Sequence, residues 1–200
     1  MTSNPNALLH RRDVVNELVR DRADLLVIAG LGAPNWDVSA AGDHANNFPL
    51  WGAMGAASMM GLGLALAQPK RKVLVITGDG EMLMSIGALA TIAVEKPANL
   101  TIAVLDNERF GETGMQKTHT ASGVDLAAMA LGAGIRTSRT VRTMEQVTEV
   151  RELAHQGKGP VFALVKINPE ALVFTLPPAD GVILTTRFRQ SVLGDEALYN

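Results

Sequence analysis

The chain has 200 residues, of which 47% are hydrophobic, and 20 acidic side chains nearly balance 18 basic ones. This length fits one domain with a sizeable core, and the charge balance provides no basic surface for nucleic acid or an anionic membrane. Because the sequence has no cysteine, any metal must bind oxygen or histidine ligands. No apolar run reaches about 18 residues, so we expect a soluble, cytoplasmic protein without a spanning helix.

Helical and strand-like segments alternate along the chain. In order, the pattern predicts a helix at 11–21, a strand at 25–29, a loop to about 50, a helix at 53–67, a strand at 73–77, a helix at 81–94, a strand at 100–105, a loop at 106–122, a helix at 124–131, a strand at 134–137, a helix at 143–156 and a strand at 161–167. This alternation predicts an α/β fold, an open parallel sheet with helices on both faces. The strands are short and continuously apolar, as in a sheet covered on both faces.

The alternating pattern stops at Asn168. Pro169, Pro177, Pro178 and Gly181 interrupt the remaining segment, although apolar residues continue within it. We therefore expect a single domain at 1–167 followed by an arm at 168–200. We expect the arm to pack on the domain or on a partner rather than to be disordered.

The first strand-to-helix loop of interest contains Gly78, Asp79 and Gly80. In open α/β sheets, ligands bind beyond the carboxyl ends of the strands. The two glycines allow the backbone to approach a ligand closely, and amides at the start of a helix can hold a phosphate group. Asp79 would supply an oxygen ligand to a metal, although a Gly-Asp-Gly triplet alone indicates only a turn.

The second loop, 105–111, follows the next strand and contains Asn107. If the two strands are neighbours, the side chains of Asp79 and Asn107 face one another. One carboxylate, one amide oxygen and a backbone carbonyl are too few for Mg²⁺, which prefers about six oxygen ligands. Phosphate oxygens and a water would complete the set, so the two loops together predict a metal and diphosphate anchor.

Gly78-Asp79-Gly80 followed by Asp106-Asn107 resembles the motif of the thiamine diphosphate-dependent enzymes, in the domain that binds the cofactor's diphosphate. The resemblance implies thiamine diphosphate and Mg²⁺ as cofactors. It implies that Asp79 and Asn107 bind the metal through their side chains and Arg109 through its backbone oxygen. Asp106 replaces the usual first asparagine, which is not the ligand position.

The same resemblance extends to other residues of these loops and to an upstream segment. Glu81, Phe110 and Gly111 are expected at the cofactor. In 48–55, which precedes a helix rich in small residues, Gly52 would accept a hydrogen bond from the aminopyrimidine and Met54 would form the wedge beneath the cofactor. Methionine is otherwise a common filler of cores.

The stretch 110–118 resembles the Gly-x-Thr-Gly-x-Gln sequence of sulfopyruvate and phosphonopyruvate decarboxylases, including the β subunits of two-chain forms. The resemblance covers roughly residues 45–167. It weakens at 32–36, where those enzymes tend to have Thr-Ser-Arg-Glu. The resemblance therefore implies a decarboxylase like these two, but the sulfonate or phosphonate substrate cannot simply be carried over to this chain.

The resemblance implies carbanion chemistry on a small 2-oxo acid, for which the cofactor supplies the reactive group. Relatives also need a glutamate on the pyrimidine nitrogen, contributed by a separate domain. The chain has no room for that domain, and Glu17 lies in an amphipathic helix where we expect it on the surface. We therefore expect a companion subunit that carries the pyrimidine-binding domain and the glutamate, in a hetero-oligomer.

Two histidines are candidate catalytic residues because they fall in loops that we expect near the active site. His44 and His119 could each transfer protons near neutral pH. An exposed loop histidine without a catalytic role is the alternative for each of them.

Three functions fit the sequence. The first is a subunit of a thiamine diphosphate-dependent 2-oxo acid decarboxylase, and the second is a carboligase or synthase with the same cofactor. The third is a noncatalytic nucleotide-binding α/β module, suggested by Gly30-Leu31-Gly32 after a strand. A third glycine in register and a downstream acidic residue are not evident for that module.

Overall fold

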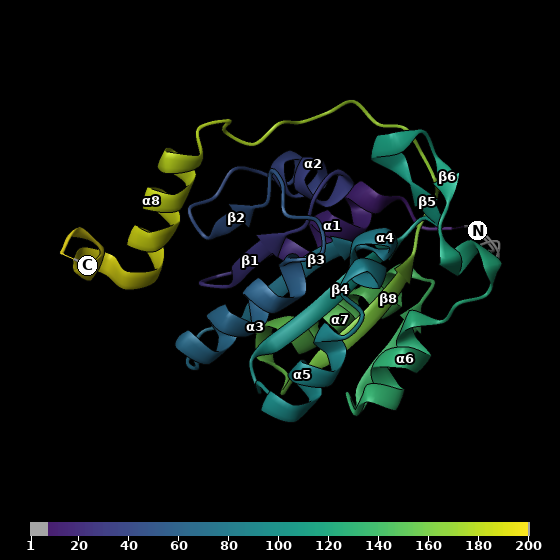
Figure 1. Ribbon diagram of the computed structural model, residues 1–200. Helices are drawn as coiled ribbons and strands as arrows, with labels where there is room; N and C mark the ends of the chain where they lie inside the picture. Colours follow the sequence, from purple (N-terminus) through teal and green to yellow (C-terminus); the bar gives the residue numbers. More distant parts are fainter. Residues whose placement is uncertain (1–7, 200) are drawn as a thin grey trace.

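The computed structural model describes residues 8–199, so the first seven residues of the expected domain 1–167 lie outside the described part. Six parallel strands form one sheet in the order β2-β1-β3-β4-β8-β7 (Figure 1). Their bounds are β1 Leu26–Ala29, β2 Asn47–Pro49, β3 Val73–Gly78, β4 Leu100–Asp106, β7 Thr137–Val141 and β8 Val161–Lys166. The predicted open parallel sheet is confirmed.

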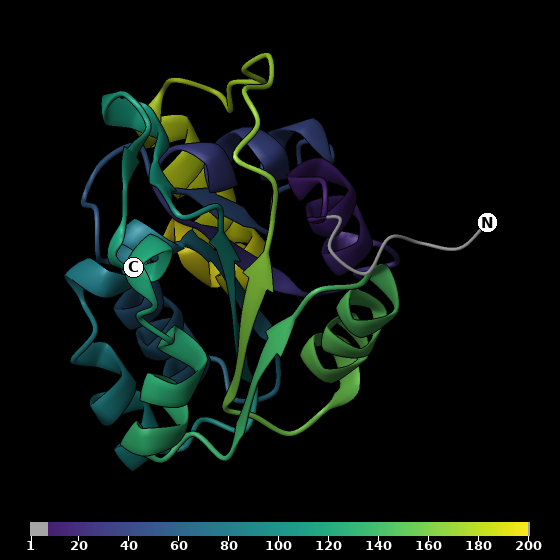
Figure 2. The same cartoon turned by 90° about the vertical axis from the view of Figure 1, so that its right-hand side faces the viewer.

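Helices cover both faces of the sheet, as Figure 2 shows. The helices α1 Arg11–Val19, α2 Ala33–Ala40 and α7 Met144–Gln156 pack on one face. On the other face lie α3 Ala57–Ala67, α4 Asp79–Met84, α5 Ala88–Glu95, α6 Leu126–Ala133 and α8 Gly181–Leu193. Because side chains alternate along a strand, Val75 of β3 joins the second core and Leu74 joins the first. None of the helices in residues 8–199 is long and apolar enough to cross a membrane.

Several predicted boundaries were wrong. The expected loop before residue 50 contains α2 and β2. The helix expected from 53 begins only at Ala57, because Ala53 and Gly55 have positive φ angles of 58° and 93° and form a turn. The helix expected at 81–94 is two helices, separated by non-helical backbone at Ser85.

The strand expected at 134–137 is β7, Thr137–Val141. Gly134, at φ 112°, ends α6 in the left-handed conformation and so cannot begin the strand. The expected loop at 106–122 contains a short antiparallel hairpin, β5 Arg109–Phe110 and β6 Gln116–Lys117, with 3-10 turns at Gly111–Thr113 and His119–Ser122. This hairpin rises beyond the carboxyl end of the sheet (Figure 1).

The segment after β8 crosses the top of the molecule and ends in α8 and a 3-10 turn at Gly194–Leu198 (Figure 1). In α8, Phe188 is buried, and its ring centroid lies 5.1 Å from that of Phe48 in β2. The Arg187 guanidinium pairs with the Asp43 carboxylate at 2.6 Å. The sequence analysis did not predict this helix, because the prolines before it obscured the pattern.

Glu17 is buried rather than on the surface, so this prediction was wrong. Its carboxylate contacts Arg20 at 3.0 Å, Arg151 at 3.2 Å and the Thr148 hydroxyl at 2.8 Å, joining α1 to α7. A carboxylate can be buried when charged and polar partners surround it in this way. Glu17 is therefore a structural residue that holds α1 against α7.

Candidate cofactor and metal site

A cavity of about 260 Å³ opens beyond the carboxyl ends of β3 and β4. Its wall contains Leu31, Ala33, Pro34, Met54, Gly78, Asp79, Gly80, Glu81, Leu105, Asn107, Arg109, Phe110, Gly111, Glu112, Thr113 and Ile167. β3 and β4 pair along their length, with Gly78 opposite Leu105. The two strands are therefore neighbours, as the sequence-based prediction required. Asp79 and Asn107 face the same cavity.

Asp79 is buried at the base of this cavity, with only 2% of its surface exposed. Its Oδ2 atom accepts hydrogen bonds from the hydroxyls of Thr118, at 2.5 Å, and Thr120, at 3.1 Å. Burial raises the pKa of Asp79 to about 6, and the Asp106 carboxylate adds to the rise, while the two threonine hydrogen bonds oppose it. Both hydroxyls bind Oδ2, so Oδ1 is the oxygen available to a cation.

Asp106, where the related motif has asparagine, forms a buried ion pair with Lys166. The Lys166 amino group lies 2.8 Å from Asp106 Oδ2 and 2.6 Å from Glu108 Oε1. Burial lowers the pKa of Lys166, but its bonds to the two carboxylates outweigh this effect and the net pKa is raised. Thr120 also donates to Asp106 Oδ1 at 2.8 Å, which links this pair to Asp79.

Glu81 connects three segments that surround the cavity. Its carboxylate accepts hydrogen bonds from the Leu31 amide at 3.1 Å, the Gly55 amide at 3.2 Å and the Thr77 hydroxyl at 2.7 Å. Burial raises its pKa. The side chain therefore fixes the turn that carries Met54 and the loop that leads into α2, a role that helix position alone did not reveal.

The Gly-x-Thr-Gly-x-Gln stretch forms the turn of the β5–β6 hairpin. The Thr113 hydroxyl donates to Gln116 Oε1 at 2.9 Å, and Gln116 Nε2 donates to the Thr113 carbonyl at 2.7 Å. Gly114 between them has a φ of 114°, which favours glycine. The motif thus shapes the β5–β6 hairpin, which we call the flap. Arg109, Phe110 and Gly111 reach the cavity from this flap.

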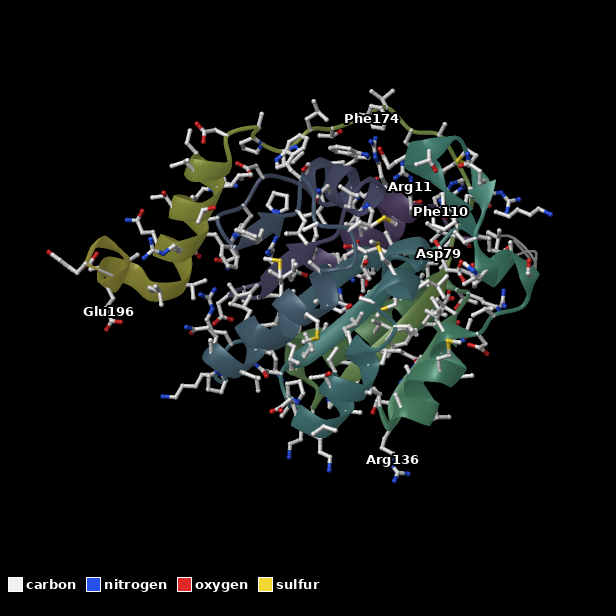
Figure 3. All side chains as sticks on the ribbon, in the orientation of Figure 1. Arg11, Asp79, Phe110, Arg136, Phe174 and Glu196 are labelled. Atoms are coloured by element: carbon white, nitrogen blue, oxygen red, sulfur yellow. The ribbon has the colours of Figure 1, made fainter. Side chains whose placement is uncertain are left out.

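Most of the residues predicted for the cofactor lie in the cavity wall: Met54, Gly78, Asp79, Gly80, Glu81, Asn107, Phe110 and Gly111, with Arg109 beside them. Figure 3 shows Asp79 and Phe110 at this edge of the sheet, below Phe174 of the arm. Gly80 is needed there, because a Cβ atom at this position would meet the Phe110 ring at 2.5 Å. Gly52 is exposed and is not part of the wall.

The structure does not bring His44 to the site. His44 precedes β2 at the amino edge of the sheet, opposite the cavity, and its Nδ1 atom accepts from the Asn46 amide at 3.0 Å. The sequence could not show this, because β2 was not predicted and the loop was assigned to the wrong edge. His119 is exposed and outside the wall, although its neighbours Thr118 and Thr120 contact Asp79.

Sequence reasoning missed Thr118, Thr120 and Lys166. Hydroxyls and a lysine within loops and strand ends are common, and no spacing in the sequence relates them to Asp79.

The structure gives Gly30 and Gly32 a role other than nucleotide binding. A Cβ atom at Gly30 would meet Glu81 at 2.0 Å, and one at Gly32 would meet Glu112 at 2.8 Å. These glycines make room for carboxylates, so they give no support to the nucleotide-binding alternative.

The cavity lies at the carboxyl ends of parallel strands and contains Asp79 and Asn107, which is where open α/β sheets bind their ligands. Residues 33–165 match the thiamine pyrophosphate enzyme family, in its C-terminal TPP binding domain, and the chain belongs to this family. The resemblance found in the sequence is thereby confirmed.

The curated relatives include two kinds of decarboxylase. The sulfopyruvate decarboxylase subunit beta of Methanocaldococcus jannaschii is 34% identical over 91% of this chain and 96% of its own length. The phosphonopyruvate decarboxylase of Streptomyces viridochromogenes is 34% identical over 84% of this chain but only 41% of its own length. This chain therefore corresponds to nearly all of the first relative and to part of the second.

Solved structures support the same fold. A protein from Mycobacterium smegmatis assigned as a thiamin diphosphate-dependent enzyme aligns with a TM-score of 0.70 and 25% identity, over 82% of this chain. The chain spans about a third of that structure, 32% of its length. The matched part is therefore a portion of a longer polypeptide.

Proposed function

We propose that this chain is the cofactor-anchoring subunit of a thiamine diphosphate- and Mg²⁺-dependent 2-oxo acid decarboxylase, and that a companion chain supplies the catalytic glutamate. The observation that carries the proposal is the placement of Asp79 and Asn107 at the tips of adjacent strands, in one cavity with Gly78 and Gly80. The chain's membership of the thiamine pyrophosphate family and the names of its relatives support the reaction type.

The donor set fits Mg²⁺ bound together with a diphosphate. Asp79 offers Oδ1, and Asn107 offers an amide oxygen that already accepts from the Arg109 amide at 2.9 Å and is thereby oriented. Within residues 8–199, no group of three or more His, Cys, Asp or Glu side chains is arranged to hold a metal. Because Mg²⁺ prefers about six oxygens, backbone, phosphate and water oxygens would complete its coordination.

The backbone of the cavity also fits a phosphorylated ligand. A Cβ atom added at Gly78 would find no heavy atom within 4 Å, so the main chain there is open to the cavity. A Cβ atom added at Gly111 would have only the Met115 sulfur nearby, at 4.0 Å. A ligand can therefore approach the main chain closely on both loops.

Bound thiamine diphosphate would supply the carbanion chemistry, and the residues of this chain orient the reactants. Glu81 holds the turn that carries Met54 through the Gly55 amide, which fixes the side chain expected beneath the cofactor. Met54 is 37% exposed and lines the cavity. Thr118 and Thr120 hold the Asp79 carboxylate through Oδ2, which would leave Oδ1 to bind a cation.

The catalytic glutamate is assigned to a companion chain because the two glutamates of the cavity wall have other contacts. Glu81 is bound by two amides and a hydroxyl, and Glu112 accepts from the Trp36 indole at 3.3 Å. The phosphonopyruvate decarboxylase relative has more than half of its length outside the match. A separate subunit would provide the corresponding domain here.

The test compares the chain alone with the chain co-purified with its companion. We expect CO₂ release from 2-oxo acids only in the complex with thiamine diphosphate and Mg²⁺. Asp79→Ala should abolish Mg²⁺-dependent cofactor binding by calorimetry, whereas Asp195→Ala, at an exposed C-terminal position, should not. Strong decarboxylation by the chain alone would refute the companion, and tight cofactor binding by Asp79→Ala would refute the metal site. Product analysis with an added aldehyde acceptor distinguishes a decarboxylase from a carboligase.

A further inference from the structure

Three aromatic side chains from distant parts of the sequence meet beside the cavity. The Trp36 ring centroid on α2 lies 5.7 Å from that of Trp51 and 5.4 Å from that of Phe174 in the arm. Trp51 Nε1 donates to the Pro178 carbonyl at 3.2 Å, which holds the arm in place. Trp51 and Phe174 remain 40% and 64% exposed. The rings therefore present an apolar surface next to the wall that α2 contributes to the cavity.

Glu112 of the hairpin reaches this aromatic cluster. Its Oε1 atom accepts a hydrogen bond from Trp36 Nε1 at 3.3 Å, and its side chain occupies the space where Gly32 lacks a Cβ atom. Glu112 also lines the cavity. A carboxylate is thus held at the point where the flap, α2 and the aromatic rings come together.

Acidic side chains outnumber basic ones in the cavity wall, which contains Asp79, Glu81 and Glu112. Arg109 is the one cationic side chain among the wall residues, and its Nη1 atom donates to the Glu108 carbonyl at 2.9 Å. On the adjoining helices, Arg11 and Arg12 both bind the Asp37 carboxylate, at 3.0 and 3.4 Å. The exposed Glu112 carboxylate forms no ion pair within residues 8–199, so no neighbouring cation neutralises its charge.

The large apolar side chains of the wall are Leu31, Pro34, Met54, Leu105, Phe110 and Ile167. Such walls favour uncharged groups, since burying an unpaired charge among them is costly, while aromatic rings add favourable contacts with planar or apolar groups. The relatives' names give sulfopyruvate and phosphonopyruvate as their substrates, and both carry a second acidic group.

We propose that the site accepts 2-oxo acids with an uncharged, apolar or aromatic side group, and that Glu112 excludes those bearing a second acidic group. This inference rests on the proposed function. Specificity of this kind needs a repulsive element as well as an attractive surface. Glu112 provides the repulsion, and the apolar wall with the rings of Trp36, Trp51 and Phe174 provides the attraction.

The experiment uses the complex with its companion, thiamine diphosphate and Mg²⁺, and measures kcat/KM for phenylpyruvate, 4-methyl-2-oxopentanoate and sulfopyruvate. We expect the wild type to prefer the two uncharged substrates at least tenfold. Glu112→Gln, which keeps the shape but removes the charge, should raise the ratio of kcat/KM for sulfopyruvate to kcat/KM for phenylpyruvate at least fivefold. Glu152→Gln, on the exposed surface of α7, is the matched control and should leave all values unchanged.

A binding measurement that does not depend on turnover accompanies the kinetics. The unreactive 3-phenylpropanoate and 3-sulfopropanoate serve as ligands in calorimetry. We expect the wild type to bind 3-phenylpropanoate with a Kd at least tenfold lower than that for 3-sulfopropanoate. In Glu112→Gln, the ratio of the two Kd values should be smaller. A wild-type preference for the sulfonate, or an unchanged preference in Glu112→Gln, overturns the inference. If no 2-oxo acid is decarboxylated, the proposed function fails, and the calorimetry still decides whether the site discriminates by charge.

Discussion

The Lys166 amino group lies 2.8 Å from the Asp106 carboxylate, and the two residues are directly paired in register at the ends of β8 and β4. Their side chains are 11% and 0% exposed. The lysine balances a carboxylate at the position where the related motif has asparagine. Two carboxylates, Asp79 and Asp106, can therefore share the floor of one site, joined by Thr120.

Replacing Lys166 should lower the free energy of unfolding. Lys166→Met leaves the Asp106 charge buried without its partner, so we expect the free energy of unfolding to fall by about 3 kcal/mol. Lys166→Met combined with Asp106→Asn removes both charges and should recover most of the loss. Urea denaturation of the full chain measures both variants. An equal loss in the single and double variants would mean that the two side chains are not coupled.

Asp79 should destabilise the metal-free protein at neutral pH. Because its pKa is raised to about 6 in the folded state, the folded chain binds the proton more tightly than the unfolded chain does. The contribution of Asp79 to the free energy of unfolding therefore falls as the pH rises from about 4 to about 6, and it stays constant at higher pH. We expect Asp79→Asn to be more stable than the wild type at pH 7 by at most about 3 kcal/mol, and to match it near pH 4.

Denaturation of both proteins between pH 4 and pH 8, with EDTA present, measures this difference. Added Mg²⁺ and thiamine diphosphate should reverse the order, because only the aspartate version gains stability from them. A difference between the two proteins that does not vary with pH would contradict the raised pKa.

Glu81 should matter for cofactor binding more than for folding. Glu81→Gln places an NH₂ group where the carboxylate now accepts from the amides of Leu31 and Gly55, so one of these segments loses its acceptor. We expect the Kd for thiamine diphosphate in the complex to rise about tenfold, equivalent to about 1.4 kcal/mol. Calorimetry measures it, with Glu152→Gln as the control. An unchanged Kd would show that the two segments are held by other contacts.

The arm should contribute to the stability of the domain through Phe188. This ring is 8% exposed and packs against Phe48. We expect Phe188→Ala to lower the free energy of unfolding by about 3 kcal/mol, and the exposed Val182→Ala on the same helix to have little effect. If Phe188→Ala changes stability by less than about 0.5 kcal/mol, in the range of ordinary surface substitutions, α8 does not stabilise the sheet.

The sequence predicted the repeating parts of the fold well, for a local physical reason. Strands such as β3 and β4 are continuously apolar, which is typical of positions covered on both faces. Segments whose structure depends on contacts elsewhere were missed. The short strand β2 is stabilised by pairing with β1, and α8 by packing of Phe188. Neither has a strong pattern of its own.

The spacing of Gly78-Asp79-Gly80 and Asn107 by itself predicted a metal and diphosphate anchor at the end of two buried strands, since turn geometry and oxygen ligands are local properties of the chain. Tertiary structure alone decided what surrounds Asp79 and Asp106 and where the other predicted residues lie. Thr118, Thr120 and Lys166 reach these two aspartates from distant positions, His44 falls at the opposite edge, and Glu112 meets Trp36 beside the cavity. Burial and charge balance depend on which strands and loops become neighbours, and this is fixed only when the whole sheet has assembled.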